Sequence, residues 1–121
     1  MRAREPDRGA ATVFVLAFGL ILVAAGLAGA SIGTARVARH QAHHAADLGA
    51  LAGAAEAIYG EPAACARAGR FVEANGARMT RCTVDGLEIV VEAEVAVHIL
   101  PGMLRHAAAK ARAGPVYALA E

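Results

Sequence analysis

The stretch GAATVFVLAFGLILVAAGLAGASIGTA, residues 9–35, decides the fold, because it runs for 27 residues without a charged side chain. A hydrocarbon core about 30 Å thick is crossed by roughly 20 helical residues, so the stretch is long enough to span a membrane. No proline interrupts it, and its hydroxyl side chains are Thr12, Ser31 and Thr34. We therefore predict a transmembrane helix over residues 10–35.

Charged residues on either side of this stretch bear on its orientation. Three arginines lie within residues 1–9, whereas Arg36 and Arg39 follow the stretch. Cytoplasmic segments carry the excess of Lys and Arg, although the difference here is small. We expect residues 1–9 to be a cytoplasmic leader and residues 36–121 an external domain of a single-pass protein of the cell membrane; the cysteines described below favour the same orientation.

The N-terminal pattern also fits a cleavable secretory signal. Ala28-Gly29-Ala30 supplies the small residues that typically precede a signal peptidase cut before Ser31. The apolar run is longer than the core of an ordinary signal and continues past Ala30, which favours a retained anchor. The alternative is a small secreted binding domain released after Ala30.

Glycines recur along the apolar stretch at helical spacing. Gly26 and Gly29 lie near its end, and residues 29–33 form a G-x-x-x-G motif that ends at Gly33. In lipid, small residues at this spacing let the backbone of a second helix approach closely. These glycines either pack against a partner helix or reflect the general frequency of glycine in membrane helices.

Helical periodicity continues beyond the stretch, through residues 36–58. Polar side chains follow one another at steps of three and four from Arg36 to Asp47, which predicts one polar helix face. The helix should end near Ile58, before Tyr59-Gly60-Glu61-Pro62. The apolar face that these steps leave comprises Ala38, Ala42, Ala45, Leu48, Leu51, Ala52 and Ala55.

A second helix over residues 62–75 and a small sheet over residues 78–113 follow. Pro62 suits a first helical turn and Asn75-Gly76 a helix end, and Asp85-Gly86 predicts a hairpin turn. Residues 87–98 alternate with period two. Residues 103–113 fit either a helix or a third strand, in which Lys110 and Arg112 would oppose Glu92 and Glu94. The predicted fold is α+β: a long N-terminal transmembrane helix that continues outside the membrane, a short helix, and an antiparallel sheet of two to three strands.

Several classes of function find no support in the sequence. The formal net charge is +1, so charge predicts no nucleic-acid partner. Ser31, the only serine, lies in the apolar stretch, which excludes a serine triad outside the membrane, and no phosphate-binding glycine loop is present. We therefore predict no enzyme, no cofactor, no catalytic residue and no small-molecule substrate.

His40, His43, His44 and Asp47 are spaced so that two pairs lie four residues apart on one helix face. That spacing can hold zinc from one side. The sequence shows no further ligands for such an ion, and no glutamate lies within the cluster as a base. We therefore assign no metal site. We expect these histidines either to solvate the helix face near lipid headgroups or to contact a partner.

Cys65 and Cys82 are the only cysteines. One lies in the predicted second helix and the other in the first strand, so a bridge would join helix to sheet. In an oxidising compartment outside the cell a disulfide is expected. The alternative is two separate buried thiols.

Short motifs along the chain resemble one family of proteins. A charged leader that ends in Arg8-Gly9, followed at once by a long apolar helix, resembles the start of TadE-like and TadG-like proteins, which are pilin-like minor components of tight-adherence pilus and secretion systems. Further motifs look like the helicase/secretion-neighbourhood branch of that group in GC-rich Gram-positive bacteria. They are residues 35–40, 45–52, 74–78, 82–86 and 111–115.

The resemblance implies a non-enzymatic, structural or assembly role and a pilin-like fold. Its implied partners are the membrane, other pilin-like subunits, secretion-platform membrane proteins and a secretion ATPase. Leader processing in this group would fall between Gly9 and Ala10. Pilin-type leaders are followed by Glu at the fifth mature position, where this chain has Phe14, so a permanently anchored accessory protein fits better than a major fibre subunit.

Overall fold

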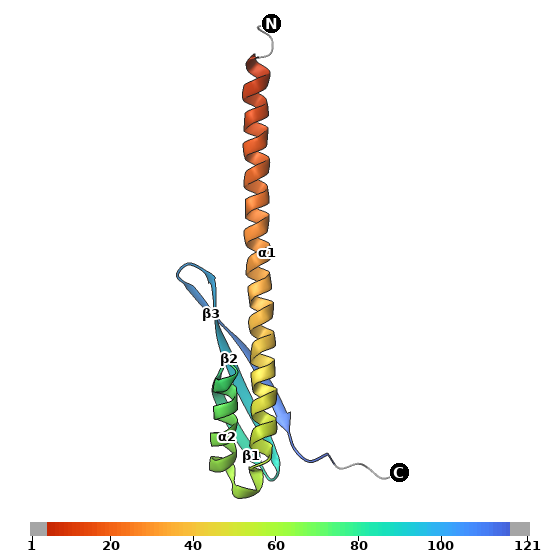
Figure 1. Ribbon diagram of the computed structural model, residues 1–121, viewed down its shortest axis with the longest axis vertical. Coiled ribbons are helices and arrows are strands. Elements are labelled where there is room, and N and C mark those ends of the chain that lie inside the picture. The colour runs from red at the N-terminus through yellow and green to blue at the C-terminus, as the bar shows by residue number, and fades with distance from the viewer. Residues whose placement is uncertain (1–4, 117–121) are drawn as a thin grey trace, which may run out of the picture. The chain divides into compact units, whose positions relative to one another are not determined.

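The computed structural model describes residues 5–116, and Figure 1 shows helices α1 and α2 and an antiparallel sheet. This confirms the predicted α+β fold with a long N-terminal helix, a short second helix and a small sheet. The chain divides into two compact units, Met1–Gly33 and Thr34–Glu121. The elements are α1 (Glu5–Ala54), a short 3₁₀ helix η2 (Ala57–Tyr59), α2 (Glu61–Ala74), β1 (Arg78–Asp85), β2 (Glu88–Leu100) and β3 (Met103–Ala113).

The unit formed by residues 34–121 contains the sheet, whose strand order is β1-β2-β3 with both pairs antiparallel. Gly86 and Gly102 occupy the two hairpin turns with φ of 63° and 83°, values that L side chains rarely adopt. Residues 103–113, which fitted either a strand or a helix, form β3. Ala109 and Ala111 are buried while Lys110 and Arg112 are exposed, so period two holds at the end of this strand.

Small side chains dominate the core of this unit. The second half of α1 contributes Ala45, Ala46 and Ala50, which cluster with Val72 of α2 and with β2. Ile89, Val72 and Val91 are the largest fully buried side chains. Because alanines bury little surface each, such a core depends on close approach of backbones.

Close approach explains why the predicted apolar face of α1 was partly wrong. Leu48 and Leu51 are 43% and 64% exposed, whereas the buried face of residues 34–54 contains only alanine and glycine. A Cβ built on Gly53 would lie 2.9 Å from the carbonyl oxygen of Ala64, so α2 lies too near for a larger side chain. The members of the buried face are Ala38, Ala42, Ala45, Ala46, Gly49, Ala50 and Gly53.

The predicted end of this helix also needs correction. The α-helix ends at Ala54 rather than near Ile58, and η2 follows it with Ile58 and Tyr59 both exposed. The second helix is one residue displaced from the expected 62–75, with Pro62 in its first turn as predicted.

One of the two predicted charge pairs on the sheet was wrong. Glu92 lies opposite Lys110 with 3.9 Å between their charged atoms, but Arg112 lies opposite Val90 and its Nε is 2.9 Å from Glu88. In an antiparallel pair, a step forward on one strand faces a step backward on the other, so Arg112 cannot face Glu94 in this register. Glu94 instead accepts a hydrogen bond from Arg78 on β1.

Candidate functional site: the apolar half of helix α1

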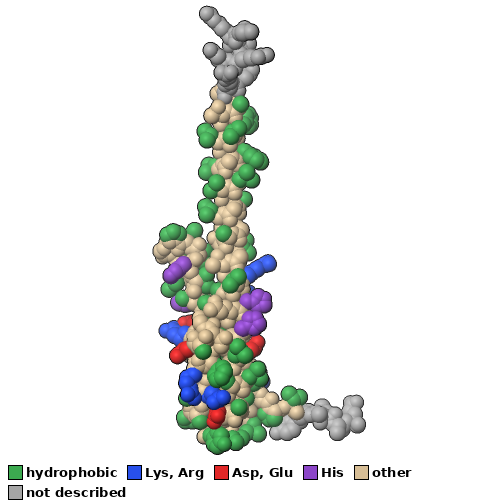
Figure 2. Space-filling model, viewed as in Figure 1, with side chains coloured by type: hydrophobic (Ala, Val, Ile, Leu, Met, Phe, Trp, Pro, Cys, Tyr) green, Lys and Arg blue, Asp and Glu red, His purple; other side chains and the backbone are tan. Residues whose placement is uncertain are grey.

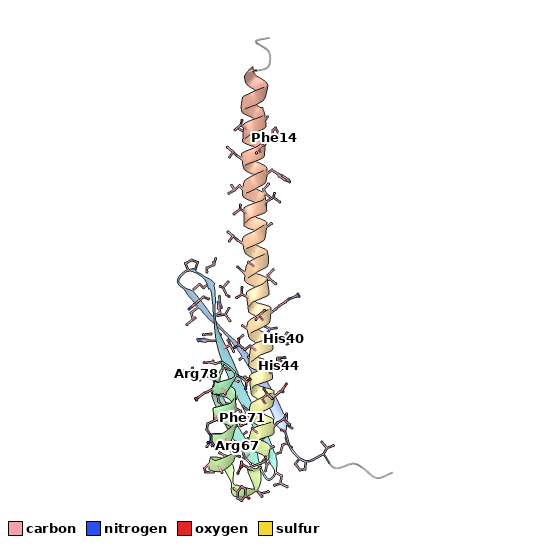
Figure 3. The ribbon with its side chains drawn as sticks, in the orientation of Figure 1. Phe14, His40, His44, Arg67, Phe71 and Arg78 are labelled. Carbon is pink, nitrogen blue, oxygen red and sulfur yellow. A yellow bond between two sulfur atoms is a disulfide. The ribbon has the colours of Figure 1, made fainter. Side chains whose placement is uncertain are left out.

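The first half of α1 exposes a long run of large apolar side chains. In the described residues one helix is long and apolar enough to cross a membrane, and none of its most apolar 18-residue window is buried. Figure 2 shows hydrophobic side chains on this segment without charged ones among the atoms that are not grey. Phe14, labelled in Figure 3, is 77% exposed, and Leu20 is 71% exposed. A contiguous apolar surface of this kind marks a membrane or protein contact.

Polar groups within this segment are compatible with lipid. The Ser31 hydroxyl donates a hydrogen bond to the carbonyl oxygen of Leu27, 2.9 Å away and one helical turn earlier. That bond satisfies the donor inside the helix, as a hydrocarbon environment requires. The backbone groups of the segment are paired in the same way, because α1 is a continuous helix across it.

The glycines of the segment have open space around them. A Cβ added at Gly26, Gly29 or Gly33 would meet nothing within 4 Å in the structure. Gly49 and Gly53 repeat the G-x-x-x-G spacing further along the same helix, and there α2 and β2 fill the space that side chains would occupy. Sequence reasoning did not single out this second motif, although its spacing is the same.

The candidate processing site lies in the first turns of α1. Gly9 and Ala10 are both helical and exposed, and Phe14 follows them on the same helix. Residues 5–9 of the predicted cytoplasmic leader form the start of α1, residues 1–4 lie outside the described residues, and no side chain of residues 1–8 is described.

The histidines lie on one face of α1 in the unit of residues 34–121 (Figure 3). The rings of His40 and His44 stack with their centroids 5.6 Å apart, and His43 and Asp47 are exposed beside them. Across residues 5–116, no group of three or more His, Cys, Asp or Glu side chains is arranged to hold a metal ion.

A disulfide joins Cys65 of α2 to Cys82 of β1, with 5.8 Å between the Cα atoms. It fits the bridge expected from the sequence. The bond ties α2 to an edge strand of the sheet, with which α2 is in contact. The cross-link therefore belongs to the framework of the unit.

A comparison with protein families gives a match over the long N-terminal helix of the chain. Residues 9–56 match the family model described as "Putative Flp pilus-assembly TadE/G-like". No curated protein and no solved structure gives a significant match. The matched segment comprises the apolar half of α1, its buried half and the first residues after it, and it ends before α2 and the sheet. The match covers less than half of the chain, and over this segment the chain is similar to TadE/G-like proteins.

Proposed function

We propose that this chain is a membrane-anchored, non-enzymatic component of a Tad-type pilus or secretion apparatus, with a structural or assembly role. The family match supports a pilin-like protein associated with a Tad pilus. The observation that carries the anchoring is the exposed apolar surface of α1 between Gly9 and Gly33. In water such a surface is strongly unfavourable, whereas lipid solvates it and leaves every backbone hydrogen bond intact.

The proposed topology places residues 1–9 in the cytoplasm, residues 10–35 in the membrane and residues 36–121 outside. The disulfide supports this orientation, because such bonds persist in oxidising compartments and are rare in the cytoplasm. Protease added to intact protoplasts should then digest the C-terminal domain. Digestion only after the membrane is opened would reverse the orientation.

The glycines of the apolar half are the proposed contact for a partner helix. Gly49 and Gly53 illustrate the principle within the chain, because α2 packs directly against them. Gly26, Gly29 and Gly33 offer the same absence of side chains on the lipid-facing segment, where packing rather than hydrophobicity drives association. Other pilin-like subunits or membrane proteins of the secretion platform are the proposed partners.

A second candidate function is a secreted domain released by signal peptidase after Ala30. The observation that favours it is the division of the chain at Gly33, which leaves residues 34–121 as a compact unit with its own core. Processing between Gly9 and Ala10 is a different cut and would leave the apolar segment in place. Phe14 argues against the cut between Gly9 and Ala10, because pilin-type leaders are followed by Glu at this position.

Carbonate extraction of membranes followed by N-terminal sequencing separates these proposals. A protein that stays in the membrane pellet and retains Val13–Ile32 supports the anchor, and a start at Ala10 would show leader processing as well. A soluble protein that begins at Ser31 would overturn the anchor and establish the secreted domain.

A further inference from the structure

The turn between β2 and β3 carries apolar side chains that the core does not use. Leu100, Met103 and Leu104 are 52%, 45% and 51% exposed, and Pro101 and Gly102 lie between them. We call residues 98–104 the hairpin tip. Solvent-facing turns normally consist of polar residues and glycine. The other turn of this sheet, Asp85-Gly86-Leu87, has one exposed apolar side chain, whereas the tip has three. An apolar tip of this kind is typical of a contact surface.

The tip lies at the same end of its unit as Thr34. Strand β2 runs opposite to α1, because its first residues lie beside the end of the helix, with Ile89 against Gly53. From Ile89 to Leu100 the strand rises about 36 Å, and from Gly53 back to Thr34 the helix rises about 29 Å. The strand is therefore long enough to reach the Thr34 end, and Figure 1 shows the two hairpin turns at opposite ends of the unit.

Charges along this unit are distributed unevenly. No Asp or Glu occurs in residues 95–113, and none occurs in α1 between Thr34 and Ala46. Exposed arginines lie in both segments, at Arg36, Arg39 and Arg105. The described ion pairs of the sheet instead involve acids nearer the other end, such as Glu88 and Glu92, and none of those ion pairs includes the three arginines. The Thr34 end is thus cationic and the tip apolar.

We propose that the hairpin tip inserts into the interface of a bilayer that contains anionic lipid. Leu100, Met103 and Leu104 enter the boundary between headgroups and acyl chains, and Arg105 with Arg36 and Arg39 lies among the phosphates. Apolar side chains flanked by cations have this affinity for anionic membranes. The inference rests on the proposed anchoring, because Thr34 directly follows the apolar segment and the anchor holds this end of the unit near the surface. Tethering makes even a small contact effective.

The chain contains no tryptophan, so a single introduced indole reports its own surroundings. Met103→Trp places it in the tip, and Leu87→Trp places it in the other hairpin turn at nearly the same exposure, 43% against 45%. Phe18→Trp reports on the anchor itself. Each full-length variant is reconstituted in phosphatidylcholine–phosphatidylglycerol vesicles with and without brominated acyl chains, which quench indole emission at depth.

Insertion predicts that the Met103→Trp emission shifts to shorter wavelength and loses about half its intensity with brominated lipid, while the Leu87→Trp emission does neither. Quenching at Phe18→Trp without quenching at Met103→Trp would overturn the inference and leave the anchor standing. Absence of quenching at Phe18→Trp would mean that the proposed anchor itself fails. A Met103→Trp signal that brominated lipid leaves unchanged but that shifts as protein density rises would show a second copy or another protein on the tip, which also overturns the inference.

A second set of variants tests the role of charge without changing the apolar tip. Arg36→Gln, Arg39→Gln and Arg105→Gln together should weaken quenching of Met103→Trp in anionic vesicles and have little effect in pure phosphatidylcholine. Arg78→Gln and Arg81→Gln together, on the opposite edge strand, remove two positive charges elsewhere on the unit and should leave the quenching unchanged. Equal effects of both sets would contradict the proposed contact with lipid phosphates.

Discussion

The two halves of helix α1 differ in which side chains they expose and which they bury. Between Gly9 and Gly33 the large apolar residues are exposed, whereas between Thr34 and Ala54 the buried face is alanine and glycine and both leucines are exposed. The second half has a protein neighbour, because α2 and the sheet cover it. Among the described residues of its own unit the first half has no such neighbour, and its surface suits a hydrocarbon solvent.

The same sequence motif illustrates this difference. Residues 29–33 and 49–53 are both G-x-x-x-G, yet only the second is filled by neighbouring atoms. In water the motif allowed a core to be built from small side chains by bringing α2 close. In lipid the motif would allow a separate helix to approach equally closely. What a glycine pair does is therefore decided by the medium and the neighbours, and not by the motif alone.

The largest expected effect comes from placing charge in the apolar half. Leu20→Arg with Val23→Arg should abolish stable insertion, because each arginine near the centre of a membrane helix costs about 2.5–3.5 kcal/mol. Leu51→Arg with Ile58→Arg is the matched control, since these residues are 64% and 69% exposed in the other unit. Carbonate extraction should release the first variant and retain the second. If both variants were released from the membrane, or neither was, the two halves of α1 would not differ in their contact with lipid.

Loss of the disulfide should weaken only the unit of residues 34–121. Replacing Cys65 and Cys82 by alanine should lower its free energy of unfolding by about 3 kcal/mol, because the closed loop no longer restricts the unfolded chain. Thermal unfolding followed by circular dichroism in detergent measures the change. Reduction of the unmodified protein should reproduce it, and membrane extraction should be unaffected. A reduced protein as stable as the oxidised one would contradict the assigned role.

The glycine pairs provide a smaller, more selective comparison. Gly53→Ala should lower the free energy of unfolding by about 1–3 kcal/mol, because the added Cβ would lie 2.5 Å from Ile89 Cδ1 and 2.9 Å from a backbone oxygen of α2. Gly29→Ala adds the same atom where nothing lies within 4 Å, so unfolding of the domain should not change. Chemical denaturation of both variants is the measurement. Equal stabilities would show that α2 does not pack this closely on α1.

The smallest expected effect concerns the charged face of the sheet. Glu92 lies 3.6 Å from Arg81 and 3.9 Å from Lys110, with both cations largely exposed. Glu92→Gln should lower the free energy of unfolding by less than about 1 kcal/mol. High salt should reduce the difference in stability between the variant and the unmodified protein, because salt screens exposed ion pairs. If the loss of stability persisted in high salt, Glu92 would stabilise the sheet by an interaction other than charge.

Sequence patterns predicted the elements better than their contacts. The apolar stretch, the helix begun by Pro62, the Asp85-Gly86 turn and the alternation of residues 87–98 each have a local physical cause, so they were recognisable. Leu48 and Leu51 were misplaced because hydrophobicity suggests burial, whereas the spacing between α1 and α2 excludes anything larger than alanine. That spacing is a property of the packed unit and is absent from the sequence of either helix.

The hairpin tip was missed for a related reason. Residues 103–113 are rich in alanine and fitted either a helix or a strand, so their position in a third strand could not be derived locally. A turn at Leu100-Pro101-Gly102 could be predicted from the sequence, but only the register of β2 and β3 pairs Leu100 with Met103 and places Arg105 near them on β3. Apolar residues next to Pro101-Gly102 were visible in the sequence and could have suggested an exposed contact.

Hydrogen–deuterium exchange of the full chain in lipid nanodiscs tests most directly that lipid solvates the first half of α1. The amides of Val13–Ile32 should remain unexchanged for hours, longer than those of the exposed face of residues 34–54, because water does not reach a helix inside the hydrocarbon core. Rapid exchange throughout Val13–Ile32, with the helix of residues 34–54 still protected, would contradict the account.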